Sequence, residues 1–395
     1  MAVLPLEIFD ETLRDGEQQA GLFYPHGVKL RLARRIARTG VHRIDLMPAV
    51  DATEAELAAT LVREGFGDVL SAATLLGPCH VEKAAACGLR RVILFYAVSD
   101  RLLFLRDPEV RDDPLLRSKT VDDRIPAAVL ARARESMTRR LLDGIRHARA
   151  RGLAVDFAAE DASRADPDFL ADLARAVSGS VEHFMVCDTV GVLTPERTGP
   201  WIRDLRRAAP GVAIAVHFHN DQGLALENTL AAVLEGATMV SGTFRGIGER
   251  AGNVALEQVL GEMKRRHGVD VPGVDREEVE RVCAELDDLG LRPAAPYTRA
   301  ARIHVSGIHV EALLQDPKSY SIFPGAELEV SFGKLGGASN FRYLFERVLG
   351  RPQPADVYRR LSDALKRRAV AEGRCYSAEE VVRLLDDGQL PLGER

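Results

Sequence analysis

The chain has 395 residues, of which 46% are hydrophobic and 28% charged, so it is long enough for one large globular domain and a smaller one. A net charge of −5 offers no basic surface for nucleic acid or for an anionic membrane, and no apolar run is long enough to span a bilayer. The N-terminus lacks the pattern of a secretory signal, and the five cysteines lack CxxC spacing. We therefore expect a cytoplasmic protein with reduced thiols and with neither a nucleic-acid nor a membrane partner.

Eight short apolar segments alternate with longer segments of helical periodicity in the first two thirds of the chain. The predicted strands are residues 8–13, 42–47, 69–76, 90–96, 153–159, 182–188, 212–218 and 237–244. Several of the helical segments between them end in a glycine, as helices with a left-handed cap do. This alternation predicts an α/β fold, a (β/α)₈ TIM barrel. A doubly wound sheet is the alternative, and it is less favoured because no GxGxxG turn follows the first strand.

Two regions depart from this alternation. Residues 99–129 form a long, charged interval after the fourth strand, where a barrel enzyme carries a lid or a substrate loop. After the barrel, a charged connector at 274–291 is followed by helical segments at 355–370 and 377–388. We therefore divide the chain into a catalytic barrel, 1–270, and a smaller, mostly helical C-terminal region, 271–395.

Polar side chains recur where the predicted strands end, at the rim that holds the active site in this fold. They are Asp10, Arg14, Asp15 and Glu17 after the first strand, Glu160, Asp161 and Arg164 after the fifth, and Asp188 and Thr189 after the sixth. Some of them can have a structural role instead: Arg14 can form a salt bridge with Asp15 or Glu17, and Glu160 or Asp161 can cap a helix.

The segment AVHFHND predicts a metal site. Alternate residues of a strand share a face, so His217 and His219 point to the same side of the seventh strand. Asp15 can add a carboxylate from the first strand, and Asn253 can add an amide oxygen from the loop after the eighth, because these strands adjoin in a closed barrel. Such ligands suit a divalent cation bound octahedrally. The alternative is a pair of histidines hydrogen-bonded into a polar barrel mouth.

Five motifs in order carry a resemblance to a known family. DETLRDGEQQAG, AEDASR, CDTVG, HFHNDQGLALEN and GIGERAGN resemble the motif series of the metal-dependent acyltransferase and lyase barrels. That family includes 2-isopropylmalate synthase, homocitrate synthase, citramalate synthase and 3-hydroxy-3-methylglutaryl-CoA lyase. The resemblance implies that Asp15, His217 and His219 bind the metal, with Asn253 near or on it. It also implies that Arg14 contacts the keto oxygen of a 2-oxo acid, which Glu160 and Thr189 surround.

This resemblance implies an acyltransferase that performs a Claisen-type condensation. A divalent ion, Mg²⁺, Mn²⁺ or Zn²⁺, would polarise the keto carbonyl, and Arg14 would stabilise the developing charge. The co-substrate would be an acyl-CoA, by family frequency acetyl-CoA. GIGERAGN places Glu249 beside the ion as a further catalytic candidate and is similar to the synthases, whereas the lyases have a cysteine in this loop. The alternative is that the glycines of this motif serve only the turn.

The segment GIHVEALLQDPKSY resembles the homocitrate synthase form of the C-terminal region. The resemblance implies that His309 and Tyr320 form an acid–base pair that reaches the active site of a neighbouring subunit. A homodimer that exchanges its C-terminal region is therefore expected, and a single chain would be incomplete. For His309 the alternative is a structural loop histidine, and we interpret His304 as structural.

The substrate is not defined by the motifs. Too few residues follow the barrel for a leucine-sensing domain, which favours a product of the homocitrate type. The third strand lacks the arginine that the family often has, so a specialised 2-oxo acid such as a phosphonate is an alternative. His80, Arg101 and Arg106 could bind its distal acid group, and we place His80, Glu17 and Arg164 among the substrate-binding candidates. A retro-aldol lyase and a non-catalytic barrel remain as alternatives of other classes.

Overall fold

The computed structural model describes residues 6–390 except 112, 114–115, 117–118, 124, 324 and 326. Eight parallel strands close into a barrel in chain order, with the first strand hydrogen-bonded to the eighth. The strands are β1 (Glu7–Asp10), β2 (Arg43–Leu46), β3 (Leu70–Leu75), β4 (Arg91–Ala97), β5 (Ala154–Glu160), β6 (Phe184–Asp188), β7 (Ile214–Phe218) and β8 (Met239–Gly242). The predicted (β/α)₈ barrel is confirmed, and its closure excludes the doubly wound sheet.

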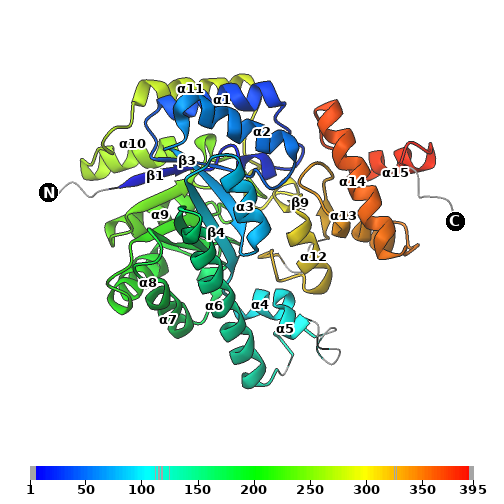
Figure 1. Ribbon diagram of the computed structural model, residues 1–395, viewed down its shortest axis with the longest axis horizontal. Coiled ribbons are helices and arrows are strands. Elements are labelled where there is room, and N and C mark those ends of the chain that lie inside the picture. Colours follow the sequence, from blue (N-terminus) through cyan, green and yellow to red (C-terminus); the bar gives the residue numbers. More distant parts are fainter. Residues whose placement is uncertain are drawn as a thin grey trace.

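Helices surround the strands (Figure 1). They are α1 (His26–Arg38), α2 (Ala52–Leu61), α3 (Pro78–Ala86), α4 (Asp100–Arg106), α5 (Pro108–Arg111), α6 (Ala127–Ala150), α7 (Pro167–Val177), α8 (Pro195–Ala208), α9 (Ala225–Leu234) and α10 (Leu256–His267). The described part of the interval 99–129 includes α4 and α5, and α4 lies against the C-terminal region. Among the described residues, no helix is long and apolar enough to cross a bilayer.

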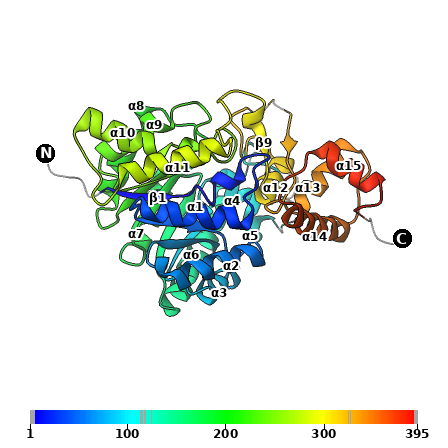
Figure 2. The same cartoon turned by 90° about the horizontal axis from the view of Figure 1, so that it is seen from above.

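The C-terminal region consists of a helix on the barrel and a separate helical body (Figures 1 and 2). Its elements are α11 (Arg276–Asp288), β9 (Ile303–His304), α12 (Gly307–Gln315), β10 (Glu329–Val330), α13 (Ala338–Tyr343), α14 (Ala355–Glu372) and α15 (Ala378–Asp386). Helix α11 packs along α1, and its buried Val282 and Leu286 belong to the barrel core. Helices α13 to α15 enclose a second core around Phe341 and Leu361. Helix α12 joins the two, because Val310 packs into the second core and Leu313 into the first.

Side chains fill the barrel interior in layers. The layer at the amino ends of the strands is charged: Arg43 pairs with the fully buried Asp156, and Arg91 pairs with Glu182. His183 contacts Asp156 from the same layer, its Nδ1 lying 3.2 Å from the carboxylate. Above it lies an apolar cluster that consists of Phe9, Ala73, Ile93, Ala158, Met185, Cys187, Ala215 and Met239. Polar groups return at the carboxyl ends of the strands, so the chemistry is confined to that rim.

We expect the charged layer to contribute strongly to stability. The Arg43→Met variant would leave the carboxylate of Asp156 fully buried, with its next cation, Arg91, 3.8 Å away. Removing one partner of a buried ion pair costs about 3 kcal/mol. Chemical denaturation should therefore show a loss of that size in the free energy of unfolding. The matched control is Arg90→Met, because Arg90 and its partner Asp68 are both exposed. An equal, small effect in both variants would contradict this expectation.

Candidate active site

Two histidines, one in β7 and one just after it, form one side of the site. His217 and His219 face the barrel interior, and their Nε2 atoms lie 3.3 Å apart. The Nδ1 atom of His217 lies 3.0 Å from the Ser241 hydroxyl, which in turn donates a hydrogen bond to Glu11. The Nδ1 atom of His219 donates to the carbonyl of Gly252 at 3.2 Å. Each Nδ1 therefore carries the proton, and both Nε2 atoms present lone pairs to each other.

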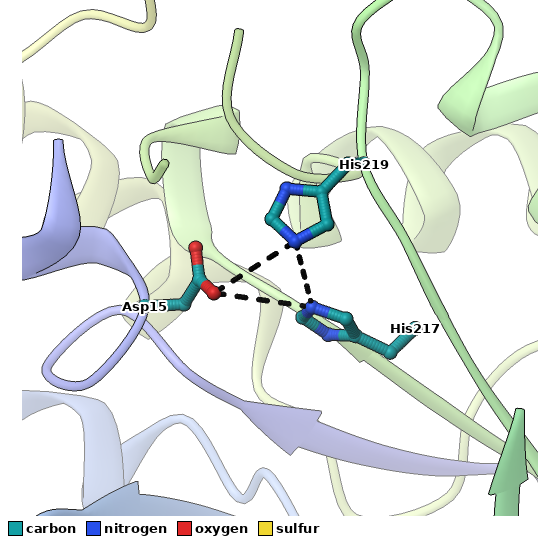
Figure 3. Close-up of side chains that lie close together, drawn as sticks. All are labelled: Asp15, His217 and His219. Carbon is teal, nitrogen blue, oxygen red and sulfur yellow. Dashed lines mark hydrogen bonds and ion pairs between the residues drawn. The ribbon is translucent and has the colours of Figure 1, made fainter. Parts of the chain in front are cut away.

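The carboxylate of Asp15 completes this group (Figure 3). Asp15 follows β1, and its Oδ2 atom lies 3.9 Å from the Nε2 atoms of both His217 and His219. A point equidistant from three atoms with these separations lies about 2.2 Å from each, which is the length of a metal–ligand bond. The Oδ1 atom of Asp15 is held by hydrogen bonds from the amide of Glu249 at 3.1 Å and from Nδ2 of Asn253 at 2.7 Å.

The protonation states suit a cation. Burial is the largest effect on His217 and lowers the pKa of its imidazole well below the usual value; burial also lowers the pKa of His219. Burial alone would raise the pKa of Asp15, but the charge of Arg14 and then the two imidazoles lower it below its usual range. Two neutral imidazoles and one carboxylate are the states in which these side chains ligate a metal. The buried Oδ1 atom of Asn253 has no hydrogen-bond partner among the described residues and fits the role of a fourth ligand.

The loop between β8 and α10 approaches this group closely at Gly248. Its φ is +148°, and a Cβ atom there would lie 2.2 Å from Nδ2 of Asn253 and 2.5 Å from Oδ1 of Asp15. Only glycine can occupy this position without moving the side chains that face the candidate metal site. The loop also carries Glu249, so the same close approach fixes that carboxylate beside the site.

A second cluster joins Glu249 to the C-terminal region. Its carboxylate hydrogen-bonds Nδ1 of His309, which lies in the first turn of α12, and Nδ1 of the buried His304 lies 3.8 Å away. Burial would raise the pKa of Glu249, but its interactions with His309, His304 and Arg250 lower it well below the usual value. An ionised Glu249 fixes the tautomer of His309 and leaves its Nε2 atom as the exchangeable position.

A third group, formed by Tyr320, Glu160 and Arg106, lies next to His309. The ring of Tyr320 stacks on the His309 ring with centroids 3.8 Å apart, and its hydroxyl donates a hydrogen bond to Glu160. Arg106 binds the other oxygen of Glu160 and also contacts the Tyr320 hydroxyl at 3.0 Å. Burial raises the pKa of Tyr320 well above its usual value. Burial would also raise the pKa of Glu160, but the charge of Arg106 lowers it. Tyr320 is therefore a neutral donor that fixes Glu160.

A cavity of about 960 Å³ connects these groups. It lies between the strand ends and the segments of the C-terminal region that cover them, and Arg14, Asp15, Glu160, Thr189, His217, His219, Glu249, His309 and His80 are among its lining residues. Arg14 contacts Glu11, Asp15 and Asp45, as the alternative of a salt bridge allowed, and it still borders the cavity. The hydroxyl of Thr189 accepts a hydrogen bond from the amide of Asp161.

Two predicted substrate-binding residues have other partners. Glu17 is buried and binds Lys29 and Lys334, while Arg164 binds Asp161 and the carbonyls of Lys318 and Ser319. Neither borders the cavity. Both lie just after a strand, but the chain turns their side chains toward neighbouring loops. Arg101 likewise pairs with Asp122 and Asp316.

Sequence reasoning missed the residues that support the histidines from behind. Ser241 faces inward from β8 opposite His217, and Glu11 follows β1 with the same inward parity. The alternation along each strand is the signal that could have identified both. His304, interpreted as structural, lies fully buried in the same cluster as Glu249 and His309.

The C-terminal residues lie over the barrel of their own chain. His309 and Tyr320 reach Glu249 and Glu160 from the same polypeptide, so the cluster does not require a second subunit to form. Whether the complete site of the protein also needs residues of a second subunit is not tested by a single chain. Exchange of this region between two subunits is not tested by a single chain and stays a prediction.

Known proteins similar to this chain include two synthases. A probable 2-isopropylmalate synthase of Ignicoccus hospitalis is 33% identical over 376 residues, which cover 92% of this chain and 88% of that protein. A homocitrate synthase of Saccharolobus solfataricus is 30% identical over 359 residues, which cover 88% of this chain and 73% of that protein. The two names differ in the substrate that they imply.

Solved structures agree in fold. The HMG-CoA lyase from Brucella melitensis superposes with a TM-score of 0.56 at 21% identity, covering 72% of this chain and 98% of that one. The hydroxymethylglutaryl-CoA lyase from Pseudomonas aeruginosa gives 0.56 at 22% identity, covering 76% and 98%. The profile of the HMGL-like family matches residues 5–108 and 120–284, which is more than half of the sequence. The chain therefore belongs to the HMGL-like family of barrels.

Proposed function

We propose that this protein is a divalent-metal-dependent acyltransferase that condenses an acyl-CoA, acetyl-CoA by preference, with a 2-oxo acid. Hydrolysis of the resulting thioester then gives CoA and a 2-hydroxy di- or tricarboxylic acid. The observation that carries the proposal is the group of Asp15, His217 and His219, which borders the same cavity as Arg14 and His309. The names of the similar synthases support this reaction class.

The metal site would be formed by Asp15, His217 and His219, with Asn253 as the fourth protein ligand. A divalent ion bound there, Mg²⁺, Mn²⁺ or Zn²⁺, would act as a Lewis acid on the keto carbonyl of the 2-oxo acid. Arg14 borders the cavity next to Asp15, and its guanidinium supplies positive charge where the keto oxygen becomes negative. The pairs of Arg14 with Asp15 and Asp45 hold it in that position.

His309 is the group that we assign to proton transfer. Its Nδ1 atom is engaged by Glu249, so its Nε2 atom can take the proton from the methyl carbon of the acyl-CoA. The ionised Glu249 stabilises the imidazolium that results. Tyr320 stacks on the ring and holds its orientation, while its hydroxyl keeps Glu160 in place at the cavity wall. We further propose a homodimer in which this region contacts the partner's barrel.

The metal ligands can be tested directly. His217→Ala and His219→Ala should each weaken Mn²⁺ binding at least about a hundredfold, since each removes one of three close ligands. Titration calorimetry or Mn²⁺ electron paramagnetic resonance gives the affinity, and oxo-acid-dependent turnover should disappear in parallel. His26→Ala is the control, because His26 lies exposed at the start of α1. Unchanged Mn²⁺ affinity in both ligand variants would remove the basis of the site.

The reaction class can be tested by following free thiol. The purified protein, Mn²⁺ and acetyl-CoA should release CoA only when a 2-oxo acid is added, because the condensation precedes hydrolysis. A retro-aldol lyase would instead cleave a 3-hydroxyacyl-CoA or 2-hydroxy acid and show no oxo-acid-dependent release. Thiol release that does not depend on any oxo acid would also contradict the proposal.

The role of the Glu249–His309 pair can be tested by separating its effect on kcat from its effects on KM and on metal binding. Glu249→Gln should lower kcat about a hundredfold with little change in the KM for the oxo acid, because the imidazolium of His309 loses its anionic partner. The Mn²⁺ affinity should stay close to that of the unaltered protein. The control is Glu257→Gln, a neighbouring acid that binds the amide of Arg245 away from the cavity. An equal loss in the two variants would point to a folding defect instead.

A further inference from the structure

Facing the candidate metal ligands, the cavity has an apolar wall. It is built by inward side chains of β3 to β5, together with Met47 directly after β2; the six residues are Met47, Ala73, Leu75, Ile93, Phe95 and Ala158. They form two rows across the strands, because Ala73 pairs with Ile93 and Leu75 pairs with Phe95, which in turn pairs with Ala158. None of the six carries a charge or a hydrogen-bond donor in its side chain, so this wall contacts a ligand mainly through its shape and its hydrophobicity.

The two smallest residues of the wall leave room in it. Ala73 and Ala158 are 9% and 8% exposed, whereas the neighbouring Ile93 is 4% exposed. Both alanines belong to the same apolar cluster as larger side chains such as Ile93 and Met185, which fill the barrel interior. Because the side chains of Ala73 and Ala158 end at Cβ, the cavity extends over these two positions. A larger side chain at either position would fill that space.

The charges around the wall disfavour an acidic ligand group. Arg14 is already assigned to the keto oxygen, and the other cations nearest the strand ends are paired: Arg106 with Glu160, and Lys334 with Glu17 and Glu54. The buried carboxyl group of Asp45 also borders the cavity, and it offers an anion no positive charge. Apart from His217, His219 and His309, which have roles in the proposed reaction, the remaining basic residues of the lining are His80, Arg111, Arg140 and Lys366, and they come from helices outside the barrel strands.

On the basis of the proposed function, we propose that this wall binds the side chain of the 2-oxo acid. That side chain is then an uncharged hydrocarbon group rather than a second carboxylate or a phosphonate, and Ala73 and Ala158 set the size that is accepted. An anionic group placed against the six apolar residues would lose its hydration without gaining a cation or a donor. A hydrocarbon group loses only unfavourable contact with water.

The first test compares 2-oxo acids of both kinds in the thiol-release assay with acetyl-CoA and Mn²⁺. The hydrocarbon set is pyruvate, 2-oxobutanoate, 3-methyl-2-oxobutanoate and 4-methyl-2-oxopentanoate, and the acidic set is oxaloacetate, 2-oxoglutarate and phosphonopyruvate. We expect the best hydrocarbon substrate to exceed every acidic one in kcat/KM by at least about a hundredfold. A dicarboxylic or phosphonate substrate that equals it overturns the inference and leaves the proposed condensation intact. Release with no oxo acid at all overturns both.

The second test reduces the space in front of the wall by enlarging its two alanines. Ala73→Leu should lower kcat/KM for 4-methyl-2-oxopentanoate relative to pyruvate by about tenfold or more, because the added atoms occupy the space of a branched side chain. Ala158→Val tests the same space with a smaller change, should Ala73→Leu fail to fold. The control is Ala52→Leu, at the exposed first residue of α2. If both wall variants lower the values for all hydrocarbon substrates equally, these positions do not set the substrate size.

Discussion

The pairing of β1 with β8 is the constraint on which the site depends. Four residues of β1 are in register with Met239 to Gly242, so the two ends of the barrel sequence become neighbours. Asp15, which follows β1, then meets Asn253, which follows β8, and the two side chains hydrogen-bond. Gly242 allows this closure, because a Cβ atom there would lie 2.6 Å from the carbonyl oxygen of Val254. A carboxylate from the start of the chain and two imidazoles from its middle can face one another only in the closed barrel.

The layering of the barrel interior separates stability from chemistry. The charged layer around Arg43 and Asp156 lies at the amino ends of the strands, and an apolar cluster lies between it and the polar rim. The same apolar cluster then has two roles, since it separates the charged layer from the cavity and also provides most of the wall that we assign to the substrate side chain. In this arrangement Ala73 and Ala158 lie apart from the charged groups Arg43 and Asp156 at the amino ends of the strands.

The cover of the site is attached to the barrel by buried charges. Lys334, from the loop before α13, binds Glu17 and Glu54, and Lys29 binds the same two acids from α1. All four side chains are nearly inaccessible to solvent. Burial of Lys29 would lower the pKa of its ammonium, but the two carboxylates outweigh burial and raise it. Removing any one of the four residues would leave a buried charge without its partner, which is costly. The cluster therefore holds the loop of Lys334 in a fixed position on the barrel.

The sequence by itself determined the barrel and the composition of its rim. The alternation of apolar and helical segments requires only local periodicity, and the alternation of faces along β7 places His217 and His219 together whatever the rest of the chain does. Tertiary structure decided which rim residues enter the cavity. Glu17 and Arg164 follow strands just as Asp15 and Glu160 do, yet they turn to Lys29 and to the loop before Tyr320. Their direction depends on partners distant in sequence, and so does the apolar wall, whose six residues come from four different strands and their carboxyl ends. Local pattern cannot contain that information, because it arises only when the strands close into one ring.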